Sequence, residues 1–269
     1  MSDARSSLTI QDLSQRKAQG GRIVVLTCYD VLFARLLDAS GVDILLVGDS
    51  VNQVLAGAET TLSATLDQMI YHTKSVRRGT ERALVICDMP FLTYQVSREE
   101  AIRNCGRVLA ETGCHGVKLE GGQPIAETMR ALVDAGIPVM GHLGLTPQSL
   151  HALGGYRVQG RDEASAARLL QDAKVLEEAG AFAIVLELIP APLASKITKA
   201  LAIPTIGIGA GPACDGQVLV LHDLLGLNDR FNAKFVKRYA TLAQDVREAV
   251  ERFAAEVREG RYPGPEHSF

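Results

Sequence analysis

The sequence predicts an α/β protein folded as a (β/α)8 TIM barrel, in which eight parallel strands alternate with helices and close into a ring. Two observations predict this fold. Short apolar runs alternate with segments of helical periodicity, and no shift in composition divides the 269 residues. Several helical segments also end in a glycine just before the next apolar run, as in Ala135-Gly136 and Ala179-Gly180. Glycine readily adopts the left-handed conformation that ends a helix. The chain therefore repeats a strand, loop, helix and turn.

Eight short apolar runs mark the expected strands. Most of them end in an acid, a glycine or another polar residue. In chain order they lie at 24–26, 44–47, 84–86, around 117, 139–140, 184–186, 206–208 and 218–221.

Seven segments with helical periodicity separate or follow these strands. We expect one barrel domain over residues 1–269, with short N-terminal and C-terminal extensions. A doubly wound sheet is the alternative, but it usually has fewer strands and carries a Gly-x-Gly-x-x-Gly turn after its first strand, which is missing after Leu26. The expected helices span 31–40, 66–78, 98–112, 125–135, 163–179, 192–200 and 235–257.

Composition limits the classes of partner. Hydrophobic residues make up 47% of the chain and charged residues 22%, with a formal net charge of −3, so there is no basic excess suited to nucleic acid or to a membrane surface. The five cysteines form no Cys-x-x-Cys pair and indicate reduced thiols. Residues 1–21 lack the apolar core of a signal peptide. We expect a cytoplasmic protein that acts on small molecules.

Three acids end three consecutive expected strands: Asp49, Asp88 and Glu120. In a parallel barrel these strand ends open onto one face, so the three carboxylates should converge there. Carboxylates in one place repel one another unless a cation lies among them, and an all-oxygen set favours Mg²⁺ over Zn²⁺. The alternative is that each acid caps a helix or pairs with a lysine or arginine. Three acids in the same register favour the metal site.

Two neighbours of these acids are candidate substrate-binding residues. Ser50 follows Asp49 and could donate a hydrogen bond to a ligand, or it could be a helix N-cap. Lys118 lies two residues before Glu120, so both side chains point to the same face of the strand. There the ammonium could hold an anionic substrate, or it could form a simple ion pair with the acid.

Two further strand-end residues suit proton transfer. Glu187 ends the sixth expected strand in apolar surroundings, where a carboxylate suits a general acid or base acting on a substrate that a metal polarises. His142 ends the fifth, between Gly141 and Gly144, and is a candidate auxiliary proton shuttle or hydrogen-bond donor. A structural histidine is the alternative for His142.

Seven motifs occur in order along the chain. They are Val47–Ser50, Cys87–Phe91, Val117–Gly122, Gly141–Gln148, Gly154–Gly160, Gly207–Gly211 and Tyr262–Phe269.

Together these motifs resemble the ketopantoate hydroxymethyltransferase family, in the phosphoenolpyruvate mutase/isocitrate lyase superfamily of barrels, over residues 27–269. The resemblance implies transfer of a hydroxymethyl group from 5,10-methylenetetrahydrofolate, the co-substrate, to 3-methyl-2-oxobutanoate. The reaction would pass through a Mg²⁺-stabilised enolate and give 2-dehydropantoate for pantothenate biosynthesis. The resemblance also implies a homodecamer.

Site residues follow from the same resemblance, position by position. Asp49, Asp88 and Glu120 match the family's Mg²⁺ site, and Glu187 matches its general base. The positions that match the keto-acid site are Asp49, Ser50, Asp88 and Lys118.

The chain departs from the family pattern beside this site. After Ser50 the family generally has a small hydrophobic residue, Gly and Met, whereas Val51, Asn52 and Gln53 stand here. Residues 58–64 also differ from the usual loop. We expect these residues to affect folate binding or the motion of a lid rather than the chemistry.

Two other functions are alternatives. A lyase or mutase of the same superfamily would carry a Lys-Lys-Cys-Gly-His loop, and this sequence has none. The second alternative is an inactive barrel that binds a metabolite for regulation. Retention of every strand-end acid argues against it.

Overall fold

The computed structural model describes residues 7–229 and 231–269. The chain divides into two compact units, Met1–Val220 and Leu221–Phe269. All eight strands lie in the first unit. The expectation of one barrel domain with short extensions stays a prediction. Among the described residues, none of the helices is long and apolar enough to cross a membrane.

The predicted barrel is confirmed. Its eight strands pair in chain order, β1 to β8, every pair is parallel, and β8 closes the ring against β1. The strands are β1 (Ile23–Thr27), β2 (Ile44–Val47), β3 (Leu84–Asp88), β4 (Gly116–Glu120), β5 (Val139–Gly144), β6 (Ala183–Glu187), β7 (Thr205–Ile208) and β8 (Gly216–Leu219).

The last strand begins earlier than the apolar pattern predicts. β8 starts at Gly216, which pairs with Ile23, and helix α9 (Leu221–Leu224) begins where we expected the strand to end. A Cβ at position 216 would lie 2.5 Å from the carbonyl oxygen of Ile23, so only glycine permits this close pairing. Because a glycine and the exposed Gln217 open the strand, hydrophobicity could not reveal its start.

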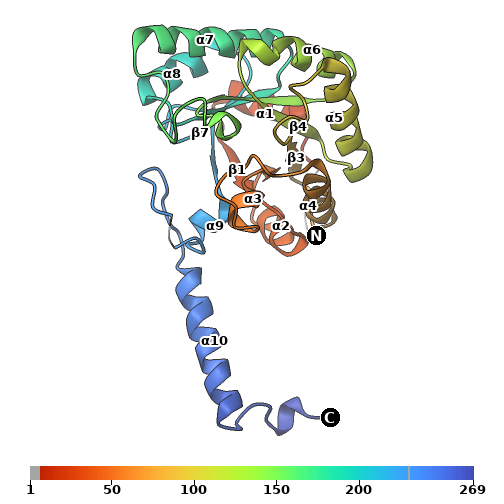
Figure 1. Cartoon of the computed structure of the whole chain (residues 1–269), viewed down its shortest axis with the longest axis vertical. Helices are drawn as coiled ribbons and strands as arrows, with labels where there is room; N and C mark the ends of the chain where they lie inside the picture. The colour runs from red at the N-terminus through yellow and green to blue at the C-terminus, as the bar shows by residue number, and fades with distance from the viewer. Residues whose placement is uncertain (1–6, 230) are drawn as a thin grey trace. The chain divides into compact units, whose positions relative to one another are not determined.

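Helices surround the barrel as the periodicity predicts (Figure 1). The six expected helices of this unit are present, each within one residue of its expected ends. They are α2 (Val31–Ala39), α4 (Leu66–Arg78), α5 (Arg98–Thr112), α6 (Ala126–Asp134), α7 (Glu163–Glu178) and α8 (Ala191–Ala200). Short helical turns follow three strands: α3 (Val51–Val54), η1 (Gln123–Ile125) and η2 (Pro147–Ser149).

In the second unit the long expected helix begins seven residues late. Helix α10 spans Leu242–Arg258, and residues 235–241 are not helical. The amide of Tyr239 donates to the carbonyl of Leu224, and that of Leu242 donates to Leu225. These bonds to the end of α9 take the place of helical ones. The unit ends in a short turn, η3 (Pro265–His267).

The N-terminal segment contains a helix that we did not expect. Helix α1 (Ile10–Ala18) begins with a capping box between Thr9 and Asp12 and buries Leu13. Lys17 Nζ lies 3.0 Å from a carboxylate oxygen of Asp215 and 2.9 Å from the carbonyl oxygen of Ile203. These groups precede β8 and β7, so α1 lies across the amino-terminal ends of the strands. Its polar composition hid it, because a single side chain is buried.

A buried acid holds this end of the barrel together. Asp43 precedes β2 and is 3% exposed, and its Oδ2 accepts the amide of Val24 at 2.9 Å. Arg16 of α1 lies 2.6 Å from Oδ2, and Arg82, before β3, lies 3.5 Å from Oδ1. One carboxylate thus connects α1 with the starts of three neighbouring strands. In barrels of this kind the amino-terminal face contributes to stability rather than to catalysis.

We therefore expect Asp43→Ala to lower the free energy of unfolding by about 2 kcal/mol, because it removes a buried carboxylate that pairs with the half-buried Arg16 and Arg82. Denaturant unfolding followed by circular dichroism measures this loss. Asp67→Ala is the control, since Asp67 pairs with Arg107 on the surface, where ion pairs contribute little. Equal stabilities of the two variants would contradict the role of Asp43.

Candidate active site

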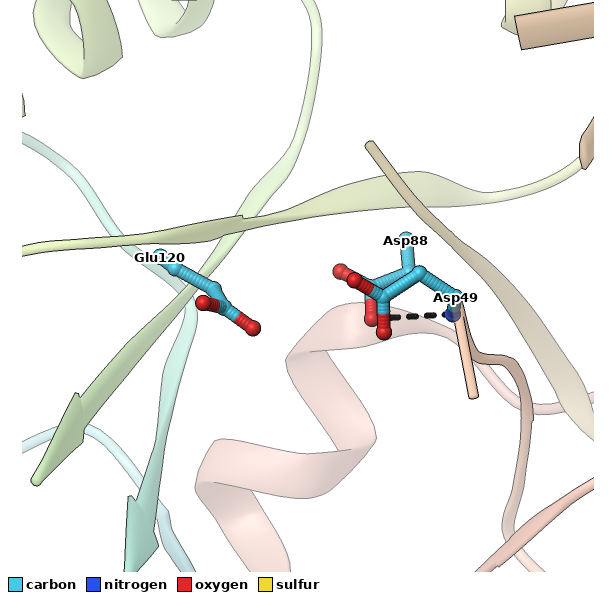
Figure 2. A group of neighbouring side chains, drawn as sticks. All are labelled: Asp49, Asp88 and Glu120. Carbon is cyan, nitrogen blue, oxygen red and sulfur yellow. Dashed lines mark hydrogen bonds between the residues drawn. The ribbon is translucent and has the colours of Figure 1, made fainter. Parts of the chain in front are cut away.

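Three carboxylates converge at the carboxyl ends of neighbouring strands (Figure 2). Asp49 follows β2, Asp88 ends β3 and Glu120 ends β4. One oxygen from each lies within 4.8 Å of the others, and each residue is at most 5% exposed. The amide of Asp49 also donates to Asp88 Oδ2 at 3.3 Å. Within the described part of the chain, this cluster could hold a metal ion, which agrees with the prediction from the strand ends.

The cluster is electrostatically strained. Burial raises the pKa of Asp49 well above its ordinary value, and the charges of Asp88 and Glu120 raise it further. Burial also raises the pKa of Asp88. A cation among the three carboxylates would relieve this repulsion. Because the donors are carboxylate oxygens, they fit a hard divalent ion.

Lys118 supplies part of the missing positive charge. Its Nζ lies 2.8 Å from Asp88 Oδ1 and 3.9 Å from Glu120 Oε1, so Lys118 and Glu120 do share a face of β4. Burial alone would lower the pKa of Lys118, but the neighbouring carboxylates outweigh burial and raise it. The side chain is therefore a charged ammonium, 3% exposed, in contact with the acids.

His142 connects the acidic cluster to Glu187. Its Nδ1 lies 3.3 Å from Glu120 Oε1, and its Nε2 lies 3.2 Å from Glu187 Oε2. Burial and Lys118 lower the pKa of His142, yet its close contacts with the two acids outweigh them and raise the pKa to about 9. The imidazolium form would form ion pairs with both carboxylates, while Nδ1 also lies 3.2 Å from Nζ of Lys118. His142 is therefore part of the cluster rather than an isolated core histidine.

Glu187 is placed by close pairing between β5 and β6. Gly144 lies opposite Glu187 with φ at +96°, and a Cβ there would lie 2.1 Å from the carbonyl oxygen of Glu187. Leu188, directly after the acid, has φ at +44°, a conformation that leucine rarely adopts. Such strain is often found at functional sites. The side chain of Glu187 remains 15% exposed, more than those of the other acids.

Ser50 lies apart from these contacts and does not cap a helix with its side chain. It occupies the N-cap position of α3, but no capping hydrogen bond forms. Instead, its Oγ lies 2.8 Å from the hydroxyl of the buried Tyr29. Asp30, another strand-end acid, does cap a helix, because it accepts the amides of Leu32 and Phe33 in α2.

Sequence reasoning missed two residues of this site. Gln148, in η2, donates from its side chain to Asp49 Oδ2 and from its backbone to Glu120 Oε2, both at 3.0 Å. Tyr94, in the loop after β3, donates to the side-chain oxygen of Gln148 at 2.8 Å. Gln148 ends one of the motifs recognised in the sequence, which was the available signal. No local pattern marks Tyr94.

The unusual residues after Ser50 hold the neighbouring loop. Asn52 is 5% exposed, and its Nδ2 donates to Thr60 O and to Ser63 Oγ, both at 2.8 Å. Gln53 Nε2 donates to Tyr156 OH at 3.1 Å. The departures from the family pattern therefore contact one another or nearby loops, and none of these bonds involves an acid of the cluster.

The fold and these groups define a (β/α)8 barrel with a buried acidic centre at the carboxyl ends of its strands, the face where barrel enzymes carry their active sites. Comparison of sequences gives the family. The sequence model of ketopantoate hydroxymethyltransferase matches residues 7–265. The chain therefore belongs to the ketopantoate hydroxymethyltransferase family and is a transferase.

Relatives named 3-methyl-2-oxobutanoate hydroxymethyltransferase are similar over the full length. One from Pelobacter propionicus is 56% identical over 269 residues, all of both chains. One from Moorella thermoacetica is 56% identical over 265 residues, 98% of each chain.

Two solved structures share the fold at low identity. Phosphonopyruvate hydrolase, in complex with oxalate and Mg²⁺, has a TM-score of 0.62 at 13% identity, covering 97% of this chain and 93% of its own. 2,3-dimethylmalate lyase, a member of the PEP mutase/isocitrate lyase superfamily, has a TM-score of 0.60 at 19% identity, covering 96% and 93%.

Because a cation would relieve the repulsion among the carboxylates, we expect millimolar Mg²⁺ to raise the melting temperature of the metal-free protein by roughly 5 °C. Asp88→Asn should abolish most of this increase. Scanning fluorimetry with and without Mg²⁺ measures both effects, with Asp67→Asn as a surface control. An equal Mg²⁺-dependent shift in Asp88→Asn would show that Asp88 is not a ligand.

Proposed function

We propose that this chain transfers a hydroxymethyl group from 5,10-methylenetetrahydrofolate to 3-methyl-2-oxobutanoate, giving 2-dehydropantoate for pantothenate biosynthesis. The names of the full-length relatives support the reaction. The observation that carries the proposal is the continuous set of contacts from the acidic cluster through His142 to Glu187. It joins a cation site to a candidate base at one end of the barrel.

We propose Mg²⁺ as the cofactor, held by Asp49, Asp88 and Glu120. Their all-oxygen donor set supports this assignment. When bound, Mg²⁺ supplies positive charge that acidifies the C3 proton of the keto acid and stabilises the enolate.

The substrate sites follow from the charges around the cluster. Lys118 is a buried ammonium suited to the carboxylate of the keto acid, and Asp49 and Asp88 lie beside it. The hydroxyl of Ser50 is free to donate to a substrate oxygen when it accepts, rather than donates, the hydrogen bond with Tyr29. The four residues proposed for keto-acid binding are Asp49, Ser50, Asp88 and Lys118.

Glu187 is the proposed general base. It removes the proton from C3 of the keto acid, and the electron pair of that C–H bond forms the enolate. The methylene carbon of the folate is bonded to two nitrogens, and the first of these bonds breaks as the donor opens to an iminium ion. The enolate carbon bonds to this carbon, and water then supplies the hydroxyl group as the second carbon–nitrogen bond breaks. The two nitrogens take up protons, and tetrahydrofolate leaves. His142 orients Glu187 by its contact at 3.2 Å and is an auxiliary residue.

If Glu187 is the base, the protein with Mg²⁺ should exchange the C3 proton of 3-methyl-2-oxobutanoate for deuterium in heavy water. Glu187→Gln should slow this exchange at least about 100-fold, because an amide cannot accept the proton. Proton NMR of the substrate follows the reaction. Glu163→Gln, in the exposed first turn of α7, is the matched control. Undiminished exchange in Glu187→Gln would assign the base to another residue.

We also propose a cytoplasmic homo-oligomer, a homodecamer by resemblance to the family. Helix α10 supports self-association, because none of its residues is buried. Four of its apolar side chains, 47% to 58% exposed, lie on one face of the helix. They are Val246, Val250, Phe253 and Val257. A second copy of the chain is the proposed partner of this face.

A charge on that face should therefore weaken the assembly. We expect Val250→Glu to reduce the molar mass measured by light scattering after size-exclusion chromatography. Arg252→Glu, on the opposite face of α10, should leave the mass unchanged. The proposal for α10 fails if both variants keep the mass of the unmodified protein.

A further inference from the structure

Gln148 is hydrogen-bonded to two of the three acids of the cluster, and every polar atom of its side chain is engaged. It is the middle residue of η2 and is 5% exposed. Its Nε2 donates to Asp49 Oδ2 at 3.0 Å and to the carbonyl oxygen of Met89 at 2.8 Å. Its Oε1 accepts from the hydroxyl of Tyr94 at 2.8 Å. The side-chain amide of Gln95 also donates to Oε1, at 3.3 Å. A buried amide held by four bonds has one orientation.

The backbone of Gln148 contacts a second acid. Its amide donates to Glu120 Oε2 at 3.0 Å. One residue therefore binds one oxygen of Asp49 and one oxygen of Glu120. The other oxygen of Glu120, Oε1, is directed toward His142 Nδ1, at 3.3 Å. A carboxylate with one oxygen held by a hydrogen bond presents its second oxygen in a defined direction.

Tyr94 is one of the groups that fix which end of the amide faces Asp49, together with the carbonyl oxygen of Met89 and the side chain of Gln95. Its hydroxyl donates to Gln148 Oε1 and accepts the amide of Glu120 at 3.1 Å. Because the carbonyl oxygen of Met89 and the carboxylate of Asp49 can only accept, the NH₂ end must point to them, and the oxygen end accepts from the hydroxyl of Tyr94. Tyr94 is 1% exposed and contacts no acid side chain by a hydrogen bond in the described structure.

A neutral donor suits this position. An amide can hold a carboxylate without the full charge that would repel a cation, whereas the ammonium of a lysine would compete with it. Lys118 already supplies one positive charge to Asp88 and Glu120. Asp49 receives its side-chain hydrogen bond from Gln148 instead.

We propose that Gln148 is a positioning residue for the metal centre: its side-chain amide holds Asp49 in the orientation that binds the cation, and Tyr94 helps to orient that amide. The inference rests on the proposed function in one respect, that Asp49 is a cation ligand. Gln148 itself is not a ligand, and it does not touch the reacting atoms.

Binding of Mn²⁺ alone to the full-length, metal-free protein tests the proposal, with electron paramagnetic resonance measuring free Mn²⁺. Gln148→Met keeps the length of the side chain and the backbone bond to Glu120 but removes both donors to Asp49 and Met89. We expect its Mn²⁺ affinity to fall at least tenfold. Ser149→Ala changes an exposed residue of the same turn and is the matched control.

Tyr94→Phe provides a second variant in case Gln148→Met folds poorly. Tyr94→Phe should weaken Mn²⁺ binding less than Gln148→Met does. The double variant should bind Mn²⁺ as well as Gln148→Met does, because Tyr94 acts through the amide of Gln148. Additive losses in the double variant would overturn the coupling of the two residues. A merely structural role would lower the melting temperature without this pattern in Mn²⁺ affinity.

Unchanged Mn²⁺ affinity in Gln148→Met, with the unmodified protein binding normally, overturns the inference and leaves the proposed function intact. Weaker binding in the variant, combined with no turnover by the unmodified protein, upholds the inference and overturns the proposed function. If the unmodified protein does not bind Mn²⁺, the metal assignment and the inference both fail.

Discussion

Mutual repulsion among three buried carboxylates is the interaction on which the arrangement of the site depends. Asp49, Asp88 and Glu120 present oxygens within 4.8 Å of one another, where water screens their charges poorly. The surrounding groups offset this repulsion in different ways. Lys118 supplies a fixed positive charge, and His142 can supply another. The charge that remains is negative, which suits a divalent cation. With such a cation bound the sum would be positive, which suits the anionic keto acid that we propose as substrate.

Barrel closure places these groups, because side chains at paired positions of parallel strands lie side by side. Asp88 pairs with Lys118, and Glu120 pairs with His142. On the next pair of strands, Glu187 of β6 pairs with Gly144 of β5, and the absence of a side chain on Gly144 permits this close pairing. The register therefore produces the contacts that run from the acidic cluster to the proposed base. At the other end of the barrel, Asp43 and α1 join the strand starts, so the interactions for stability lie away from those for chemistry.

Much of the fold and of the acid cluster could be predicted because both depend on local patterns. Apolar runs marked all the strands, and periodicity marked the barrel helices to within one residue. The predictions failed where contacts distant in sequence decided the structure. Helix α1 is polar and is held by groups before β7 and β8, and residues 235–241 bond to the end of α9 instead of forming a helix. The acids were found by their position at strand ends, but Asp30, at a similar position, caps α2.

The sequence by itself determined the barrel, the family and the identity of the acids, because strand ends and motifs are contiguous in the chain. Only the tertiary structure decided how each side chain is oriented. Gln148 and Asp49 are 99 residues apart, and Tyr94 and Gln148 are 54 apart, so no local pattern links them. Their hydrogen bonds exist because closure of the barrel brings the loops after β2, β3 and β5 together in a buried place, where each polar group must find a partner. The need for a partner arises from burial, and which polar groups are buried is decided by the tertiary structure.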